Sequence, residues 1–200
     1  MSAPDDPSAV GLRERKKART RAAIQRAALR LFREQGYQAT TVEQIAAAAD
    51  ISPSTFFRYF PTKEAVVLQD EYDPMIIEAF KSVPPDLSPI AALRRAFGEV
   101  FAQLPEESLE RARDRTELIR TVPELRSAML EEFARNVQMI AELVAERVGR
   151  RPDDLAVRTL AGAMVGAVMA AMLSWVEGSG KEFQELLDSA MAQLEAGLPL

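Results

Sequence analysis

The 200-residue chain contains no cysteine and no histidine. Without cysteine it can form neither disulfide bonds nor thiolate metal sites, and this composition fits a reducing cytosol. Without histidine it lacks the usual general base and the commonest protein ligand of metals, so histidine-based hydrolase triads and zinc sites are excluded. The sequence also shows no paired acidic motif for carboxylate catalysis. We therefore predict that the protein is not an enzyme and uses neither a metal nor a cofactor.

Signals for secretion and for membrane insertion are also weak. Residues 1–10 contain no basic residue and no apolar run, so we predict a disordered tail and not a signal peptide. Residues 159–176 carry no charge, but the segment is rich in alanine and glycine, which drive membrane insertion poorly. A fully buried helix has the same apolar appearance on all sides. We therefore predict a buried helix in a cytoplasmic protein without a membrane partner.

The net charge of −5 alone argues against binding to nucleic acid, but the charge is unevenly distributed. Residues 11–62 contain ten basic and four acidic residues, which gives this segment a net charge of +6. Residues 63–200 contain 15 basic and 24 acidic residues, a net charge of −9. A basic segment joined to an acidic body is expected when one end of a protein contacts phosphate.

Apolar residues recur at helical spacing along the chain, and no alternating run predicts a strand. We predict an all-α protein of about nine helices, the first from residue 12 to Gln35, where Gly36 ends it. Residues 63–81 predict a longer helix that connects the N-terminal part to the body. The apolar face of the first helix consists of Ile24, Ala27, Ala28, Leu31 and Phe32.

Two short helices are expected over residues 42–49 and 53–59. Thr41 is placed to cap the first, with Gln44 three residues later in the capping-box position. Ser52 is placed to cap the second, where a proline follows in the first helical turn. A long helix followed by two short helices with a tight turn between them predicts a homeodomain-like helix-turn-helix, whose second short helix enters the major groove.

These elements predict three parts of the chain. Residues 1–10 form the tail, residues 11–62 form the three-helix DNA-binding domain, and residues 63–200 form a helical domain for effector binding and dimerisation.

Candidate DNA contacts follow from the side chains of this segment. Ser54, Thr55 and Arg58 are expected to share one face of the predicted recognition helix, where Arg58 could bind a guanine edge or a phosphate. Phe56 and Phe60 point the other way, into the core of the domain. A basic run in the first helix suits a phosphate clamp or a minor-groove arm, although a basic face is often merely solvated. This run includes Arg13, Lys16, Lys17 and Arg19.

Three further polar residues stand at the starts of predicted helices. Thr41 and Ser52 are adequately explained as caps, and their position also suits phosphate binding. Lys63 either neutralises Glu64 or holds a phosphate.

Residues 39–46, ATTVEQIA, and residues 51–64, ISPSTFFRYFPTKE, resemble the TetR family of bacterial repressors. The similarity extends from about Lys17 to Leu68. It implies an all-helical homodimer with an N-terminal DNA-binding domain and a C-terminal domain for effector binding and dimerisation. By position, the resemblance implies that Ser52, Pro53, Ser54, Thr55 and Arg58 face DNA, and that Tyr59 and Lys63 contact phosphates.

Three positions depart from the family pattern. Asp50 stands where the family often has glycine, and aspartate tolerates a left-handed backbone. Ser54 replaces a common glycine. Phe57 replaces a common tyrosine, so a phosphate contact through that hydroxyl is not available.

The helix expected from Leu155 to Glu177 divides by side-chain size. Its small half, which includes Gly162, Gly166 and Ala170, would allow another helix to approach closely. We predict that this half forms part of a dimer interface together with the helix over residues 181–196, and close packing within one subunit is the alternative.

The larger residues of the same helix could line a cavity or form an ordinary core. The body also resembles a TetR subgroup that is described as binding acyl-CoA-like effectors, through residues 118–126, 152–155 and 175–178. The resemblance implies that Arg120 or Arg126 meets an anionic head group, unless it is solvent-exposed or paired with a nearby glutamate. The predicted ligand-binding residues are Phe97, Phe101, Arg120, Met129, Phe133, Met164, Val168, Met172 and Trp175.

Together these features predict a homodimeric repressor that binds a palindromic operator in double-stranded DNA. Its two recognition helices would lie about one DNA turn (~34 Å) apart. A small hydrophobic or acyl-CoA-like effector would change this separation. The alternative is a helical small-molecule-binding or carrier protein with an incidental basic segment, and salt-dependent DNA binding would distinguish the two.

Overall fold

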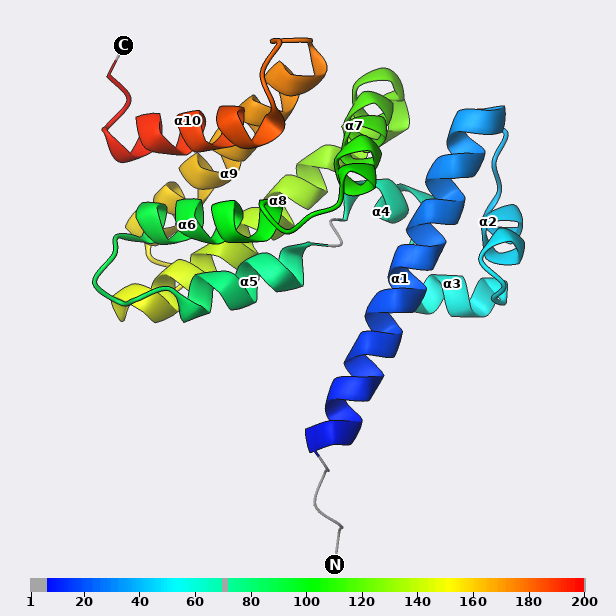
Figure 1. Ribbon diagram of the computed structural model, residues 1–200, viewed down its shortest axis with the longest axis horizontal. Coiled ribbons are helices and arrows are strands. Elements are labelled where there is room, and N and C mark those ends of the chain that lie inside the picture. Colours follow the sequence, from blue (N-terminus) through cyan, green and yellow to red (C-terminus); the bar gives the residue numbers. More distant parts are fainter. Residues whose placement is uncertain (1–6, 70–71, 200) are drawn as a thin grey trace, which may run out of the picture. The chain divides into compact units, whose positions relative to one another are not determined.

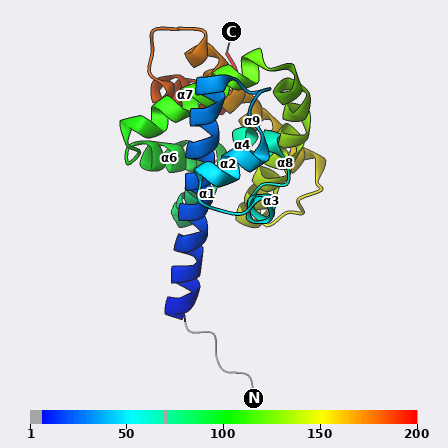
Figure 2. The ribbon, with the colours of Figure 1, turned by 90° about the vertical axis from the view of Figure 1, so that its right-hand side faces the viewer.

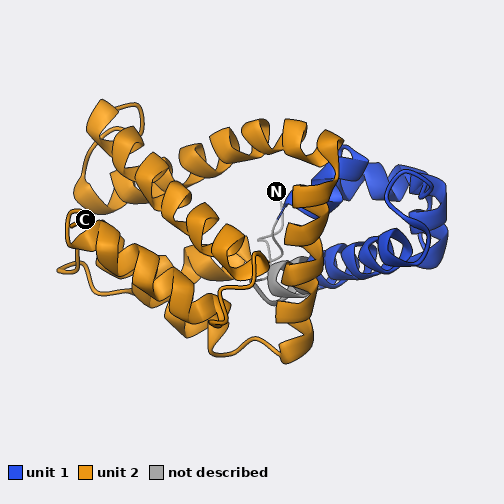
Figure 3. Ribbon diagram, turned by 90° about the horizontal axis from the view of Figure 1, so that it is seen from above, with its two compact units in different colours: residues 1–71 blue, residues 72–200 orange. Residues whose placement is uncertain are grey.

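The computed structural model describes residues 7–69 and 72–199, with side chains from Lys16 onward (Figure 1). These residues form ten α-helices and no strand, which confirms the all-α prediction. The chain divides into two compact units, Met1–Glu71 and Tyr72–Leu200 (Figure 3).

The first unit contains four helices: α1 (Pro7–Gln35), α2 (Val42–Ala48), α3 (Pro53–Tyr59) and α4 (Lys63–Leu68). Helix α1 packs against α2 and α4, and α2 packs against α3. The N-terminal half of α1 extends beyond α2 and α3 in both views (Figures 1 and 2). On the predicted apolar face of α1, Leu31 is half-buried and the other four residues are buried. The core also contains Ile45, Phe56, Phe60, Val66 and Val67.

Helix α1 begins at Pro7, so the tail predicted over residues 1–10 is wrong for Pro7 to Val10. A proline is tolerated in the first turn of a helix, because its missing N–H would have no partner there. Residues 1–6 lie outside the described part of the chain.

The single helix expected over residues 63–81 is also wrong. The structure has two helices, α4 and α5 (Asp73–Ser82), and Gln69 after α4 has an extended backbone. Pro74 lies in the first turn of α5, where it is compatible with a helix, whereas in the interior of a longer helix it would remove a hydrogen bond. The two units divide after Glu71, so α4 belongs to the first unit and not to the body that was expected to begin at residue 63.

The second unit begins with α5 and continues with five longer helices. These are α6 (Pro89–Phe101), α7 (Glu106–Thr121), α8 (Pro123–Val148), α9 (Leu155–Val176) and α10 (Phe183–Glu195). Helix α9 packs against α8 and α10, α10 also contacts α6, and α6 contacts α5. The most deeply buried large side chains of this unit are Leu93, Leu125, Met164, Met191 and Val144.

Helix α9 is less buried than its composition suggested. Six of its 22 residues are buried, so the expectation that it is buried on all sides is wrong. Leu155 is 79% exposed and Leu173 is 42% exposed. By length and composition alone α9 could cross a membrane, a test that the core helices of soluble proteins also pass. Part of its apolar surface is left uncovered by the chain's own described residues.

Candidate DNA-binding surface

The turn between α2 and α3 is fixed by local backbone and capping interactions. The Thr41 hydroxyl accepts a hydrogen bond from the Gln44 N–H at 3.3 Å, and the Gln44 side chain accepts one from the Thr41 N–H at 3.0 Å, which confirms the capping box. Asp50 has a left-handed backbone with φ = 55°, as its short polar side chain allows. The Ile51 N–H then donates to the Ala46 carbonyl at 3.0 Å. This turn therefore holds α3 close to α2.

The start of α3 is held by hydroxyl groups. The Ser52 hydroxyl accepts a hydrogen bond from the Thr55 N–H at 3.1 Å, so its predicted role as a cap is confirmed. It also donates to Thr55 Oγ1 at 3.0 Å and lies 2.9 Å from Ser54 Oγ. Pro53 occupies the first turn, as predicted. The hydroxyls of Ser52, Ser54 and Thr55 are thus held together by hydrogen bonds within the chain itself.

Side chains of α3 separate into a buried and an exposed face. Phe56 and Phe60 are fully buried, as predicted. Ser54, Phe57 and Arg58 are exposed, and their spacing of i, i+3 and i+4 places them on one face of the helix.

Two further predicted contacts, Thr55 and Tyr59, are half-buried at the margins of this exposed face. The guanidinium carbon of Arg58 lies 5.6 Å from the centre of the Tyr59 ring. Phe57 was not predicted to contact DNA from the sequence. Its position three residues after Ser54, which places the two residues on one face of a helix, was the signal that could have indicated it.

The basic run of α1 is partly described. Lys16, Lys17 and Arg19 are exposed, as a phosphate-binding surface requires. Arg13 lies within the α1 backbone, but its side chain is outside the described residues.

Lys63 is engaged within the protein. Its ammonium group donates to the carbonyl oxygens of Tyr37 at 2.9 Å and Thr40 at 3.1 Å, and it lies 4.1 Å from the centre of the Tyr37 ring. These bonds use two of its three N–H donors, and the described residues give no hydrogen-bond partner for the third. Lys63 therefore ties the start of α4 to the loop between α1 and α2.

The neighbouring Glu64 interacts with Tyr37, whose hydroxyl donates to the carboxylate at 3.0 Å. Burial raises the pKa of Glu64, but hydrogen bonds from its own backbone N–H, from Tyr37 and from Thr62, together with the charge of Lys63, outweigh this effect. The net result is a pKa below the ordinary value of a glutamate. This carboxylate is therefore stabilised in its charged form.

The predicted ligand-binding residues lie in the second unit, where some of them meet in a row of aromatic rings. Ring centroids are 6.0 Å apart for Phe97 and Phe101, 5.3 Å for Phe101 and Phe183, and 5.2 Å for Phe183 and Trp175. Met164 is fully buried, whereas Met129, Phe133, Val168 and Met172 are half-buried. Arg120 is exposed and donates to the Glu117 carboxylate at 2.7 and 2.8 Å, which is the pairing considered as an alternative to ligand binding.

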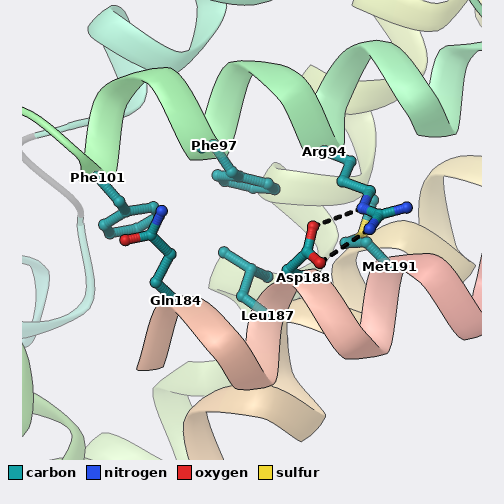
Figure 4. A pocket seen from close by; sticks show the side chains of 8 residues that line it. Arg94, Phe97, Phe101, Gln184, Leu187, Asp188 and Met191 are labelled. Atoms are coloured by element: carbon teal, nitrogen blue, oxygen red, sulfur yellow. Dashed lines mark hydrogen bonds and ion pairs between the residues drawn. The ribbon is translucent and has the colours of Figure 1, made fainter. Parts of the chain in front are cut away.

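A pocket of about 70 Å³ lies between α6 and α10 (Figure 4). Phe97 and Phe101 line it, and the Arg94 guanidinium donates to the Asp188 carboxylate at 2.5 and 2.8 Å along its wall. Pockets for drug-sized ligands typically measure about 300–1,000 Å³. In this conformation the pocket is too small for a long acyl chain.

The small residues of α9 have open space beside them. A Cβ atom added at Gly162 or Gly166 would meet no atom within 4 Å among the neighbours considered in the same chain, and Ala170 is exposed. Close packing within one subunit therefore does not explain these small residues.

Comparison with known families gives two matches along the chain. The model described as bacterial regulatory proteins, tetR family, matches residues 24–69, which include α2, α3 and α4. The model described as MftR C-terminal domain matches residues 87–199, more than half of the chain.

Individual proteins are similar over most of their length. The HTH-type transcriptional regulator TcmR of Streptomyces glaucescens is 36% identical over 155 residues, which cover 74% of this chain and 69% of the relative. A protein named as the mycofactocin biosynthesis transcriptional regulator MftR, from Mycobacterium tuberculosis, is 28% identical over 186 residues, 92% of this chain and 93% of the relative.

Among solved structures, Thermus thermophilus FadR, a TetR family transcriptional repressor in complex with lauroyl-CoA, matches with a TM-score of 0.55 at 28% identity. The match covers 90% of this chain and 95% of that chain.

Proposed function

The chain belongs to the TetR family of bacterial regulatory proteins, with an MftR-type C-terminal domain, and we propose that this DNA-binding transcriptional regulator acts as a ligand-responsive homodimeric repressor. The family is not enzymatic. Membership also removes support from the alternative of a carrier protein without DNA recognition, because the tetR-family model covers the helix-turn-helix itself.

The exposed face of α3 supports the proposed DNA contact most directly. Ser54 and Arg58 are presented on a helix whose start is capped by Ser52 and whose approach is fixed by the turn at Asp50. An arginine in the major groove binds the O6 and N7 atoms of guanine with two hydrogen bonds. Lys16, Lys17 and Arg19 would contact phosphates, which fix the register but carry no sequence information.

The remaining predicted contacts have supporting roles in this proposal. The hydroxyls of Ser52 and Thr55 order the start of α3, and Pro53 and Tyr59 border its exposed face. Thr41 holds the start of α2, and Lys63 has one remaining N–H for a phosphate.

Dimerisation would cover the apolar surface of α9. Gly162, Gly166 and Ala170 leave room for the backbone of a second helix, and Leu173 beside them is exposed. A two-fold dimer would present two copies of α3 to half-sites about one DNA turn (~34 Å) apart, and the operator would be palindromic for the same reason. A repressor that acts on bacterial DNA would work in the cytoplasm.

The proposed effector is a small hydrophobic or acyl-CoA-like molecule that binds in the second unit. Support comes from the likeness to the FadR structure that contains lauroyl-CoA, and from the aromatic row that ends at Trp175. The pocket of about 70 Å³ would have to widen on binding. A ligand that prefers the widened state would shift the population towards a dimer that no longer fits adjacent grooves.

Selection of duplexes from a random DNA library with the purified protein tests the proposal. We expect a palindromic consensus with half-sites one turn apart, two protomers per site, and an affinity that falls steeply with salt. Lauroyl-CoA should release the selected duplex, with coenzyme A lacking the acyl chain as the control. Absence of any selected sequence would contradict the DNA-binding role, and release by neither compound would contradict the acyl-CoA effector.

A further inference from the structure

Phe57 is a large apolar side chain that is 52% exposed on α3. A single exposed apolar residue is ordinary on a protein surface. This one, however, lies on the same face of α3 as Ser54 and Arg58, the exposed polar residues of that helix proposed to enter the major groove. Phe57 would therefore also lie against the DNA when α3 enters the major groove.

The Phe57 ring is held in place by its buried neighbour. It contacts the Phe56 ring edge-to-face, with ring centroids 5.4 Å apart and an interplanar angle of 86°. Phe56 is itself fully buried and packs against Phe60 with centroids 6.0 Å apart. A ring restrained in this way loses little conformational freedom when a partner covers its exposed side.

The chemistry of phenylalanine limits what it can recognise. It has no hydroxyl, so it can neither donate a hydrogen bond to a phosphate nor read a polar base edge. In the major groove, thymine alone presents an apolar group, its 5-methyl, and phenylalanine is among the side chains that contact it. Covering a polar base edge with the ring would remove water without replacing its hydrogen bonds.

We propose that Phe57 is a specificity-determining residue that recognises the 5-methyl group of a thymine in each half-site. This inference rests on the proposed function, because it requires α3 to lie in the major groove. Phe57 and Arg58 are adjacent and about 100° apart around the helix, so they reach neighbouring base pairs. The half-site therefore contains a thymine within one or two base pairs of the guanine that Arg58 contacts.

Replacing thymine by deoxyuridine removes the methyl group and leaves the hydrogen-bonding atoms unchanged. Each thymine of the duplex selected by the wild-type protein is replaced in turn, and affinity is measured by fluorescence anisotropy at fixed salt. We expect one thymine per half-site at which the replacement weakens wild-type binding about fourfold, as expected for burial of one methyl group.

Variants connect this effect to the side chain. Phe57→Ala should bind the thymine duplex more weakly and should bind the thymine and deoxyuridine duplexes equally at that position. Phe57→Tyr, which keeps the ring, should retain the discrimination. Leu130→Ala, at a residue that is 75% exposed on α8, is the matched control and should behave as the wild type. Circular dichroism checks that each variant retains its helices.

A second selection from random DNA with Phe57→Ala should return a consensus that has lost its preference for thymine at this position. Wild-type binding that ignores every methyl group, or full methyl discrimination by Phe57→Ala, would overturn the role of Phe57 while leaving the regulator itself intact. A wild-type protein that selects no sequence would overturn both the role of Phe57 and the proposed function.

Discussion

The guanidinium of Arg21 in α1 donates to the side-chain oxygen of Gln69, the residue that directly follows α4, at 2.6 Å. A second nitrogen of Arg21 lies 3.3 Å from the carbonyl oxygen of Tyr59, the last residue of α3. One turn further along α1, the buried side chain of Gln25 donates to the carbonyls of Val66 at 3.2 Å and Gln69 at 2.8 Å. Helix α1 therefore holds the ends of both α3 and α4.

Replacing Gln25 by leucine should destabilise the first unit, because two carbonyl groups lose their buried donor. We expect the free energy of unfolding in urea to fall by about 1–3 kcal/mol. Operator binding should weaken as well, since α4 would lose bonds that anchor it to α1, the helix that carries Lys16, Lys17 and Arg19. Gln138→Leu on α8 removes an exposed side-chain hydrogen bond and should change stability by less than about 0.5 kcal/mol. Equal effects of the two substitutions would show that Gln25 is not an anchor.

A comparison of Ser52→Ala with Ser88→Ala distinguishes an effect on stability from an effect on DNA binding. Ser52 caps α3 and Ser88 caps α6, and each accepts a hydrogen bond at 3.1 Å from the backbone N–H three residues later. Replacement by alanine should lower the free energy of unfolding by about 1 kcal/mol in each case. Ser52→Ala should also weaken operator binding, because the Ser54 and Thr55 hydroxyls lose their common partner. Gel-shift titrations that give the same affinity for both variants would contradict this assignment.

A charge on the small face of α9 should prevent dimerisation. Ala170 is exposed in the single chain, so Ala170→Glu should leave the subunit folded while placing an unpaired carboxylate in the proposed interface. Sedimentation velocity at micromolar concentration should show a dimer for the wild type and a monomer for the variant. Leu130→Glu, on the exposed surface of α8, is the control and should remain dimeric. A dimeric Ala170→Glu protein would place the interface elsewhere.

The lowered pKa of Glu64 predicts a pH dependence of stability. Burial raises this pKa, but hydrogen bonds from its own N–H, from Tyr37 and from Thr62 lower it by more than burial raises it. The pKa of Glu64 is lower in the folded state than in the unfolded state. The carboxylate therefore stabilises the fold at pH values above the ordinary pKa of a glutamate, and this contribution is lost as the pH falls through the folded-state pKa.

Urea unfolding of the wild type and Glu64→Gln should therefore differ at about pH 7 and converge towards about pH 3. Glu146→Gln, at a side chain that is 72% exposed on α8, is the control and should differ little from the wild type at either pH. A difference between the wild type and Glu64→Gln that stays constant with pH would contradict the role of the charged form.

Local sequence rules predicted the details of the helix-turn-helix. Thr41 and Ser52 cap their helices through contacts within four residues, and Asp50 adopts the left-handed backbone that its residue type tolerates. Phe56 and Phe60 are buried because their spacing of four places them on one face. Such features depend on neighbours in the sequence, so the sequence reveals them.

Features that depend on distant residues were predicted less well. The two carbonyl partners of Lys63 lie 23 and 26 residues away, and nothing in its local sequence indicates them. Pro74, in the first turn of α5, was the available signal for the break between α4 and α5, because a proline is disfavoured in the interior of a helix. Helix α9 has the apolar composition of a core helix, and composition alone does not tell whether each of its faces is covered within the same chain.

The central claim is that the exposed face of α3 reads base pairs. The direct measurement compares wild type and Arg58→Ala on the selected duplex and on a scrambled duplex of the same length and composition, at about 150 mM salt. We predict that Arg58→Ala weakens binding to the selected duplex by about 1–3 kcal/mol, while binding to the scrambled duplex changes much less. An Arg58→Ala protein with wild-type affinity for the selected duplex, or with equal losses on both duplexes, would contradict the claim.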